Sequence, residues 1–149
     1  MLRAVVLAIA ISAVVGTTFN GATAQNVDVI KERKALLKEM ADAAKLPGGM
    51  IKGEIPFDAA PVKAALAKFV ANGPKLKELF PDNSKTGGET AALPAIWDNK
   101  ADFTQRFEKF VAMASAADAS ITDEIAFQEE WPKVMGNCGG CHKQYQKEQ

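Results

Sequence analysis

Both cysteines and the only histidine of this 149-residue chain lie within five residues, in the segment Cys138-Gly-Gly-Cys141-His142 near the C-terminus. A disulfide between these cysteines would close a loop of only four residues and would stabilise a domain of this size very little. A structural zinc ion needs four protein ligands, and the cluster supplies three. The cluster therefore indicates chemistry at one place on the chain rather than cross-linking of the fold.

On a helix, Cys138, Cys141 and His142 project to roughly the same side, because positions three and four residues apart share a face. Two thiols one turn apart match the two vinyl groups on one edge of a haem, and the adjacent imidazole can ligate the iron. The spacing is the signature of c-type haem attachment. A non-haem dithiol redox protein is the alternative class, but its Cys-x-x-Cys motif usually follows a strand, and the sequence contains no strand pattern.

The first residues have the pattern of a secretory signal peptide. Arg3 supplies a positive charge, residues 4–15 are nearly all apolar, and Ala22-Thr23-Ala24 offers a cleavage site. We expect residues 1–24 to be removed, which leaves 25–149 as one domain without stable membrane insertion. We expect the protein in the periplasm, where c-type haem is attached, so the leader and the cysteine motif support each other.

Four stretches of the remaining chain have apolar residues at the three-and-four spacing of an α-helix. Three of the stripes include Ile30, Leu37 and Met40; Val62, Leu66, Phe69 and Leu76; and Phe103, Phe107, Phe110 and Ala114, and the fourth helix would run through Ile125, Trp131 and the cysteines to about Tyr145. Four helices joined mostly by short loops pack most simply as an antiparallel bundle, so we predict an all-α four-helix bundle with the haem motif near the end of its last helix.

Turn and cap residues predict where these helices begin and end. We expect Asp58, Asp98 and Thr122 to cap the second, third and fourth helices. Pro47-Gly48-Gly49 should loosen or end the first helix, Gly73-Pro74 should kink or briefly break the second, and Pro132 should kink the fourth or mark a late start. Residues 80–97 are rich in glycine, proline and polar side chains, and we predict a long loop there, whose length suggests a role.

The charge pattern excludes one class of partner. Lysine and arginine number 18, equal to aspartate and glutamate, and the two signs are interspersed along the chain. Without a basic excess or patch to neutralise phosphates, we expect no nucleic-acid binding. No acid–base pair or nucleophilic constellation accompanies the haem motif, so we expect ligand binding or electron transfer rather than an enzyme.

The second axial position of the iron decides the function. His142 is the only histidine, so the protein ligands to consider are Met40, Met50, Met113 and Met135. A methionine ligand would give a low-spin, six-coordinate electron carrier, whereas an apolar residue would leave the iron open to small ligands. Met40 is the strongest methionine candidate, although a methionine on a helical stripe is more often core.

Arg33 lies on the same helical face as Ile30, Leu37 and Met40. An unpaired guanidinium is costly to bury there, and a haem propionate would give it a charge-assisted partner. The alternative is an arginine at the edge of the stripe that extends to water.

Nearly the whole mature chain resembles the cytochrome c′ family, the class II c-type cytochromes. The likeness rests on the segments "IKERKALLKEM", "KGEIPFDAA", "GGETAALPAIW" and "CGGCHKQY". It implies that Arg33 lies on the propionate side of the haem, that Leu37 covers its open face and that Met40 is a buried core residue. In low-spin relatives the ligand methionine occupies the position of Leu37, and leucine cannot coordinate iron.

The resemblance implies a five-coordinate, high-spin haem c, one per chain, attached through Cys138 and Cys141 and ligated by His142. Such a site would serve electron transfer, binding of nitric oxide and carbon monoxide, or both. The resemblance also implies a periplasmic redox partner, and family members often form homodimers through the first two helices. Two positions depart from the family pattern. Gln146 stands where a basic residue usually follows the aromatic residue, and Pro132 lies within the last helix.

Overall fold

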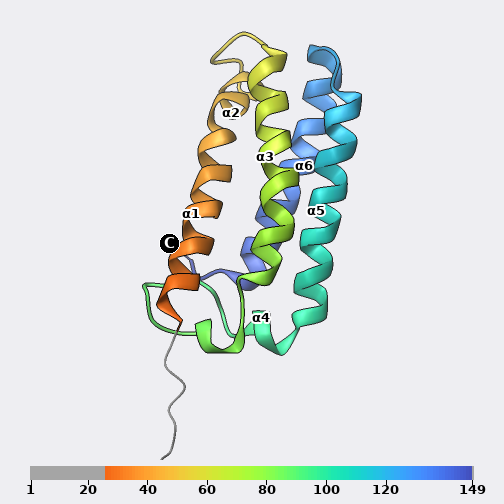
Figure 1. The fold of residues 1–149 in the computed structure, drawn as a ribbon. Helices are drawn as coiled ribbons and strands as arrows, with labels where there is room; N and C mark the ends of the chain where they lie inside the picture. The colour runs from red at the N-terminus through yellow and green to blue at the C-terminus, as the bar shows by residue number, and fades with distance from the viewer. Residues whose placement is uncertain (1–25, 149) are drawn as a thin grey trace, which may run out of the picture.

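The computed structural model describes residues 26–148, and Figure 1 shows them as an elongated bundle of helices. The predicted leader, residues 1–24, lies outside the described residues. The elements are α1 (Val27–Ala43), α2 (Lys45–Ile51), α3 (Ala59–Glu78), the 3-10 helix η1 (Asp82–Ser84), α4 (Ala95–Asp98), α5 (Lys100–Ser120) and α6 (Glu124–Tyr145). The helices α1, α3, α5 and α6 run alternately up and down, so the antiparallel four-helix bundle is confirmed.

Three of the long helices begin at a side chain that accepts a backbone N–H. The Asn26 side chain accepts from the N–H of Val29, that of Asp58 from Ala60, and that of Asp123 from Ala126. Such caps satisfy donors that the first turn of a helix leaves without partners. The cap at Asp58 agrees with the sequence prediction. The fourth helix starts one residue later than Thr122 suggested, and α5 is preceded by Asn99 because Asp98 belongs to α4.

The sequence predicted a kink or break at Gly73-Pro74 and a kink or late start at Pro132, and the break and the late start are wrong. The first helix ends at Ala43, before Pro47-Gly48-Gly49. The chain continues helically through Gly73-Pro74 in α3 and through Pro132 in α6, and Pro47-Gly48-Gly49 lies inside the short helix α2. A proline removes one backbone donor, but the apolar face around it stays buried here, with Leu76 beside Pro74 and Trp131 beside Pro132. Packing of these faces outweighs the lost hydrogen bond.

The main core fills the end of the bundle that carries α2, and we call this the closed end. Phe127 stacks against Phe57 and Trp131 with ring centroids 5.3 and 5.9 Å apart, and Trp131 also contacts Phe69. Where α3 crosses α5, a side chain at Gly73 would lie 2.3 Å from a methyl carbon of Val111, so only glycine allows the two helices to approach this closely.

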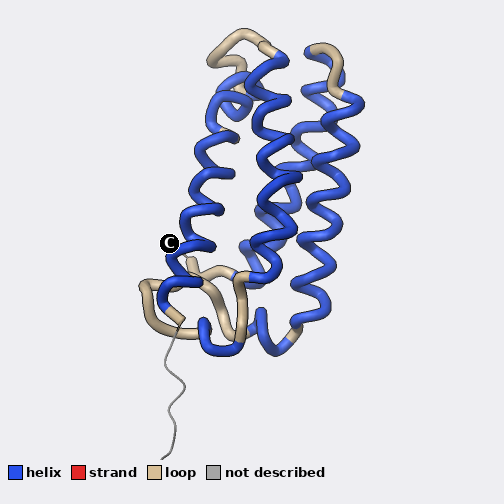
Figure 2. Tube along the Cα trace, in the orientation of Figure 1, coloured by secondary structure: helices blue, strands red, loops and turns tan. Residues whose placement is uncertain are grey.

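The long connection between α3 and α5 closes the other end of the bundle, which we call the cavity end (Figure 2). The predicted loop is present, although it contains η1 and α4. Gly88 has φ +54°, and a side chain there would meet Ile30 of α1 at 3.0 Å. The loop also pairs with the chain after α6: Leu93 N–H donates to Tyr145 O, and Lys147 N–H donates to Ala91 O.

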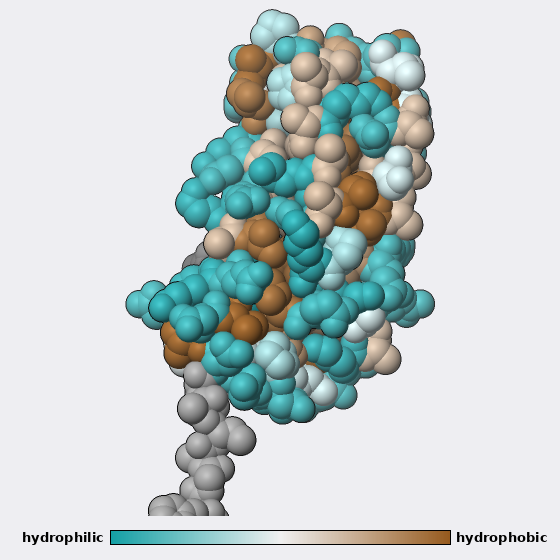
Figure 3. All heavy atoms as spheres, in the orientation of Figure 1, coloured by the Kyte–Doolittle hydropathy of each residue, from teal (hydrophilic) through white to brown (hydrophobic). Residues whose placement is uncertain are grey.

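Hydrophilic side chains cover most of the face seen in Figure 3, with apolar side chains in separate patches. Within residues 26–148, none of the helices combines the length and the apolar character that crossing a bilayer requires. Among the charged side chains of residues 26–148, Arg33 is the one that is buried.

Candidate functional site

A cavity of about 360 Å³ opens at the cavity end between α1, α5, α6 and the loop. Its volume lies in the range of cofactor and ligand sites. The six residues predicted for the site all line it: Arg33, Leu37, Met40, Cys138, Cys141 and His142. The structure thus brings together residues that are a hundred positions apart in the sequence.

Aromatic and aliphatic side chains form most of the remaining wall. Phe80, Ile96, Phe103 and Tyr145 form a small buried cluster beside the cavity, and Phe107 and Phe110 extend it along α5. Phe80 is fixed from behind, because the Trp97 indole N–H and the Lys100 ammonium both donate to its carbonyl oxygen, at 3.0 and 2.7 Å. The wall therefore suits a flat, largely apolar molecule.

Cys138 and Cys141 lie in the last two turns of α6 as free, partly buried thiols. Burial raises the pKa of both thiols, in Cys141 against the opposing influence of Arg106. Nucleophilic dithiol motifs work through a lowered thiol pKa, which favours the thiolate. The electrostatics of the site therefore argue against the dithiol redox alternative.

The imidazole of His142 lines the cavity one residue after Cys141. It is exposed along the cavity, yet desolvation by the surrounding protein lowers its pKa. A lowered pKa favours the neutral ring, which is the form that ligates metals. Within residues 26–148, no three His, Cys, Asp or Glu side chains converge as a chelating cluster. The two thiols and the ring are thus spread along the wall instead of meeting at a point.

Arg33 is only 2 % exposed, so the alternative in which it extends to water is wrong. Its guanidinium donates to Leu79 O, to both Oγ and O of Ser84 and to Oγ1 of Thr90, at 2.6 to 3.2 Å. It also lies 4.6 Å from the ring centroid of Phe80. Burial lowers the pKa of Arg33, and among the described residues it forms no ion pair that would offset this cost.

Leu37 and Met40 are the two apolar residues of α1 that line the cavity. Leu37 is 37 % exposed and lines the cavity, whereas Met40 is 8 % exposed and also packs into the main core. Met50, Met113 and Met135 do not line the cavity. The Met113 sulfur instead accepts a hydrogen bond from the Asn137 side chain at 3.2 Å. Of the methionines within residues 26–148, Met40 alone borders the site.

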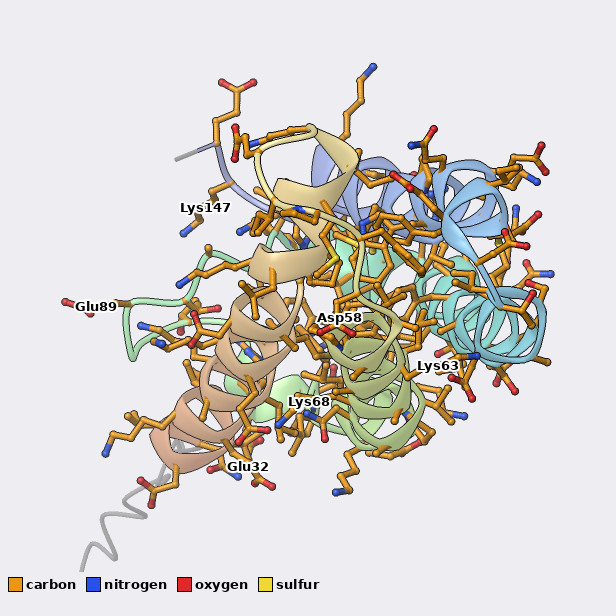
Figure 4. All side chains as sticks on the ribbon, turned by 90° about the horizontal axis from the view of Figure 1, so that it is seen from above. Glu32, Asp58, Lys63, Lys68, Glu89 and Lys147 are labelled. Carbon is orange, nitrogen blue, oxygen red and sulfur yellow. The ribbon has the colours of Figure 1, made fainter. Side chains whose placement is uncertain are left out.

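The rim carries charges from several segments. Lys34 of α1 pairs with Glu89 at the tip of the loop, at 3.7 Å. Figure 4 shows Glu89 and Lys147 pointing outward on the same side of the molecule. The Lys147 ammonium donates to Thr90 O at 3.3 Å, so the end of the chain holds the loop through a side chain as well as through the backbone.

Sequence reasoning missed Arg106, which lines the cavity from α5. Its Nε donates to Asp102 at 2.6 Å and its Nη2 to Gln144 of α6 at 2.8 Å. One signal was available: Arg106 follows Phe103 by three residues and therefore lies beside the apolar stripe of its helix. Its partner Gln144 is 38 positions away and left no trace in the sequence pattern.

The residues present fit a covalently bound haem. Two neutral thiols and a neutral imidazole stand along one wall of an apolar cavity, and a buried guanidinium without a carboxylate partner stands along another. A haem would supply apolar surface for the wall, vinyl groups for the thiols, iron for the imidazole and carboxylates for the guanidinium. This set defines a c-type haem protein with a four-helix-bundle fold.

Comparison with known proteins identifies the family. The family profile described as Cytochrome C′ matches residues 28–146. Cytochrome c′ of Rhodopseudomonas palustris is 45 % identical over 126 residues, which cover 85 % of this chain and 86 % of the relative. Cytochrome c-556 of Agrobacterium fabrum is 34 % identical over 117 residues and covers 78 % and 79 %. The chain belongs to the cytochrome c′ family.

The fold comparison agrees. The structure of cytochrome c′ from Rhodopseudomonas palustris matches with a TM-score of 0.80 at 46 % identity, covering 82 % of this chain and 98 % of that one. Members of the family carry covalently bound haem c with its iron, and the cofactor prediction made from Cys138, Cys141 and His142 is confirmed.

Proposed function

We propose that this protein is an exported, periplasmic haem protein whose five-coordinate iron binds nitric oxide and carbon monoxide, transfers single electrons, or both. Haem c, when bound, supplies an iron that changes its charge by one electron and accepts a diatomic ligand. The observation that carries the proposal is Leu37, a hydrocarbon side chain on the α1 wall of the cavity that holds His142 on its α6 wall.

The chain's own residues divide the work. Cys138 and Cys141 would hold the haem covalently, and His142 would ligate its iron through a ring that desolvation keeps neutral. Arg33 would bind a propionate, since its own protein partners are all uncharged oxygens. This role uses the charge of Arg33, while its hydrogen bonds to Ser84 and Thr90 keep the guanidinium in place.

Leu37 would set ligand preference by what it lacks. Its side chain offers no hydrogen-bond donor to stabilise charge on bound dioxygen, so the site should favour nitric oxide and carbon monoxide. Met40 contributes to the core and would not reach the iron, because it packs with the main core cluster. No group with an acid–base role accompanies these residues in the proposal, which therefore includes no turnover chemistry.

The ferric absorption spectrum of the purified haem protein tests the proposal. We expect a high-spin, five-coordinate spectrum that changes when nitric oxide is added to the ferrous protein. Leu37→Met should convert it to a low-spin spectrum with a sulfur-to-iron band near the red edge. Leu36→Met is the matched control, because Leu36 is the neighbouring leucine and does not line the cavity.

Met40→Leu separates this proposal from the six-coordinate electron carrier. In the five-coordinate protein the substitution should leave the high-spin spectrum unchanged. A wild-type spectrum that is low-spin and becomes high-spin in Met40→Leu would make Met40 the axial ligand and would overturn the proposed open site.

A further inference from the structure

Four side chains connect α5 to the last turn of α6 beside the cavity. Arg106 Nε donates to an oxygen of Asp102, and the Tyr145 hydroxyl donates to the same oxygen. Arg106 Nη2 donates to Gln144 Oε1 at 2.8 Å, and Gln144 in turn donates to the Tyr145 hydroxyl at 3.2 Å. The guanidinium also lies 5.6 Å from the centroid of the Tyr145 ring. These contacts form a closed polar network.

The two charges of this network are not equally placed. Arg106 lines the cavity together with Cys141 and His142, whereas Asp102 does not line it. The side chains of Arg106 and Asp102 are only 35 % and 33 % exposed, so solvent screens them incompletely. A group in the cavity therefore experiences the cation of the pair more strongly than the anion.

The pair stays charged across the neutral range. The hydrogen bond between them raises the pKa of Arg106 and lowers the pKa of Asp102, and the Tyr145 hydroxyl lowers the pKa of Asp102 further. The Arg106 side chain is held by hydrogen bonds to Asp102 and Gln144 and by its contact with the Tyr145 ring, so its charge occupies a fixed place. A fixed charge acts on a buried group more effectively than a mobile, hydrated one.

We propose that Arg106 raises the reduction potential of the haem and that Asp102 is the positioning residue that holds it against the His142 wall of the cavity. The inference rests on the proposed function. In the step concerned, one electron from an external one-electron donor converts ferric to ferrous iron, the charge of the site falls by one, and no bond forms or breaks. A nearby cation favours the state of lower positive charge, and a nearby anion opposes it.

Other charged groups at the cavity are constant in this comparison. Arg33, Lys34 and Glu89 approach it from α1 and the loop. Each belongs to contacts that do not involve Arg106 or Asp102. Substitutions in the α5 pair therefore change one local charge at a time.

Redox titration of the intact haem protein, with dithionite as reductant and ferricyanide as oxidant, tests the inference. Arg106→Gln should lower the equilibrium constant for reduction about three- to tenfold, and tenfold corresponds to about 59 mV for one electron. Asp102→Asn removes the anion but keeps a side-chain oxygen that can accept from Arg106, so it should shift the potential upward by a smaller amount. Arg106→Lys, which keeps the positive charge, should keep the reduction potential close to that of the wild-type protein.

Lys109→Gln is the matched control, because Lys109 is exposed on the same helix, is also a cation and does not line the cavity. It should leave the potential within error of wild type. If the network only holds α5 against α6, Arg106→Gln and Asp102→Asn should both lower the stability of the protein. Their reduction potentials should then stay constant or move in the same direction. Either result would overturn the inference.

The two proposals fail in distinguishable ways. If the wild-type protein carries covalent haem with a high-spin spectrum while the two variants do not shift in opposite directions, only the role of Arg106 is wrong. If a pyridine haemochrome assay finds no covalent haem in the wild-type protein, the proposed function and the role of Arg106 are both wrong.

Discussion

The closed end and the cavity end of the bundle are built from similar side chains but reach different degrees of completeness. At the closed end, Phe57, Phe69, Phe127 and Trp131 stack directly on one another within a large continuous core. At the cavity end, Phe80, Ile96, Phe103 and Tyr145 form a core of only four buried side chains beside a cavity of about 360 Å³. The first end is filled by the chain itself, whereas the second needs a cofactor to complete its packing.

The largest expected effect comes from removing the covalent attachment. Cys138→Ser combined with Cys141→Ser should abolish covalent haem, measured as pyridine haemochrome after denaturation. Hydrogen exchange of the Phe103 and Tyr145 amides should accelerate at least about tenfold relative to the haem-loaded protein, because the cavity end loses its filling. The Phe69 and Phe127 amides should keep their protection. Equal acceleration at both ends would show that the bundle depends on haem throughout.

Removing one buried ring at each end should show that the closed end contributes stability alone, whereas the cavity end also determines the haem spectrum. Phe127→Ala should lower the free energy of unfolding by about 3–5 kcal/mol, since the ring is almost fully buried, and should leave the haem spectrum unchanged. Phe103→Ala, equally buried but beside the cavity, should shift the haem spectrum. Denaturant titration and absorbance measure the two effects. A spectral change in Phe127→Ala would contradict the division between the ends.

Arg33→Met should lower the free energy of unfolding by about 2–4 kcal/mol, because the hydroxyls of Ser84 and Thr90 and two carbonyl oxygens lose their donor. The loss should be larger in the haem-loaded protein than in the haem-free one if a propionate also binds this guanidinium. Lys34→Met, at an exposed neighbour, should change stability by no more than about 0.5 kcal/mol. Equal losses for Arg33→Met with and without haem would exclude the propionate role.

The smallest expected effects are on acid stability, and each end supplies one carboxylate. Hydrogen bonds from Lys38 and Lys45 lower the pKa of Asp42 to about 2, and hydrogen bonds from Arg106 and Tyr145 lower the pKa of Asp102. A folded-state pKa below the unfolded value of about 3.9 contributes stability above that pH, and this contribution is lost as the pH falls through the folded value.

Asp42→Asn and Asp102→Asn should therefore each make the stability curve slightly flatter below about pH 4. Carboxyl-carbon NMR of the wild-type protein should show both groups titrating below the ordinary aspartate range. Only Asp102→Asn should also shift the reduction potential of the haem, because only Asp102 holds a residue of the cavity wall, Arg106. An ordinary pKa for Asp102 would mean that its hydrogen bonds do not persist in solution.

The sequence predicted the helices well because apolar periodicity reports directly on burial. Ile30, Leu66, Phe69 and Phe110 were all assigned to inward faces, and all are buried. The breaks were predicted poorly, because proline and glycine report local preference while tertiary packing decides. Gly49, for example, is buried within α2, where a side chain would lie 2.7 Å from Ile55.

The candidate site was predictable to the extent that its chemistry is local. The spacing of Cys138, Cys141 and His142 indicates haem attachment directly. The place of Arg33 on an apolar face left two alternatives, a haem propionate as partner or extension to water. Its actual protein partners, Ser84 and Thr90, are more than 50 positions away, and hydroxyl donors and acceptors occur throughout a sequence without pattern. Arg106 was missed for the same reason.

The strap between the loop and the end of α6 consists of main-chain atoms: Leu93 N–H to Tyr145 O and Lys147 N–H to Ala91 O. Main-chain hydrogen bonds of this kind do not depend on which side chains the joined residues carry. Evolution can therefore exchange residues such as Gln146 at this seam, and change the surface charge next to the haem, without loosening the closure. Among ordinary replacements, proline at 93 or 147 is the one that would remove a donor from it.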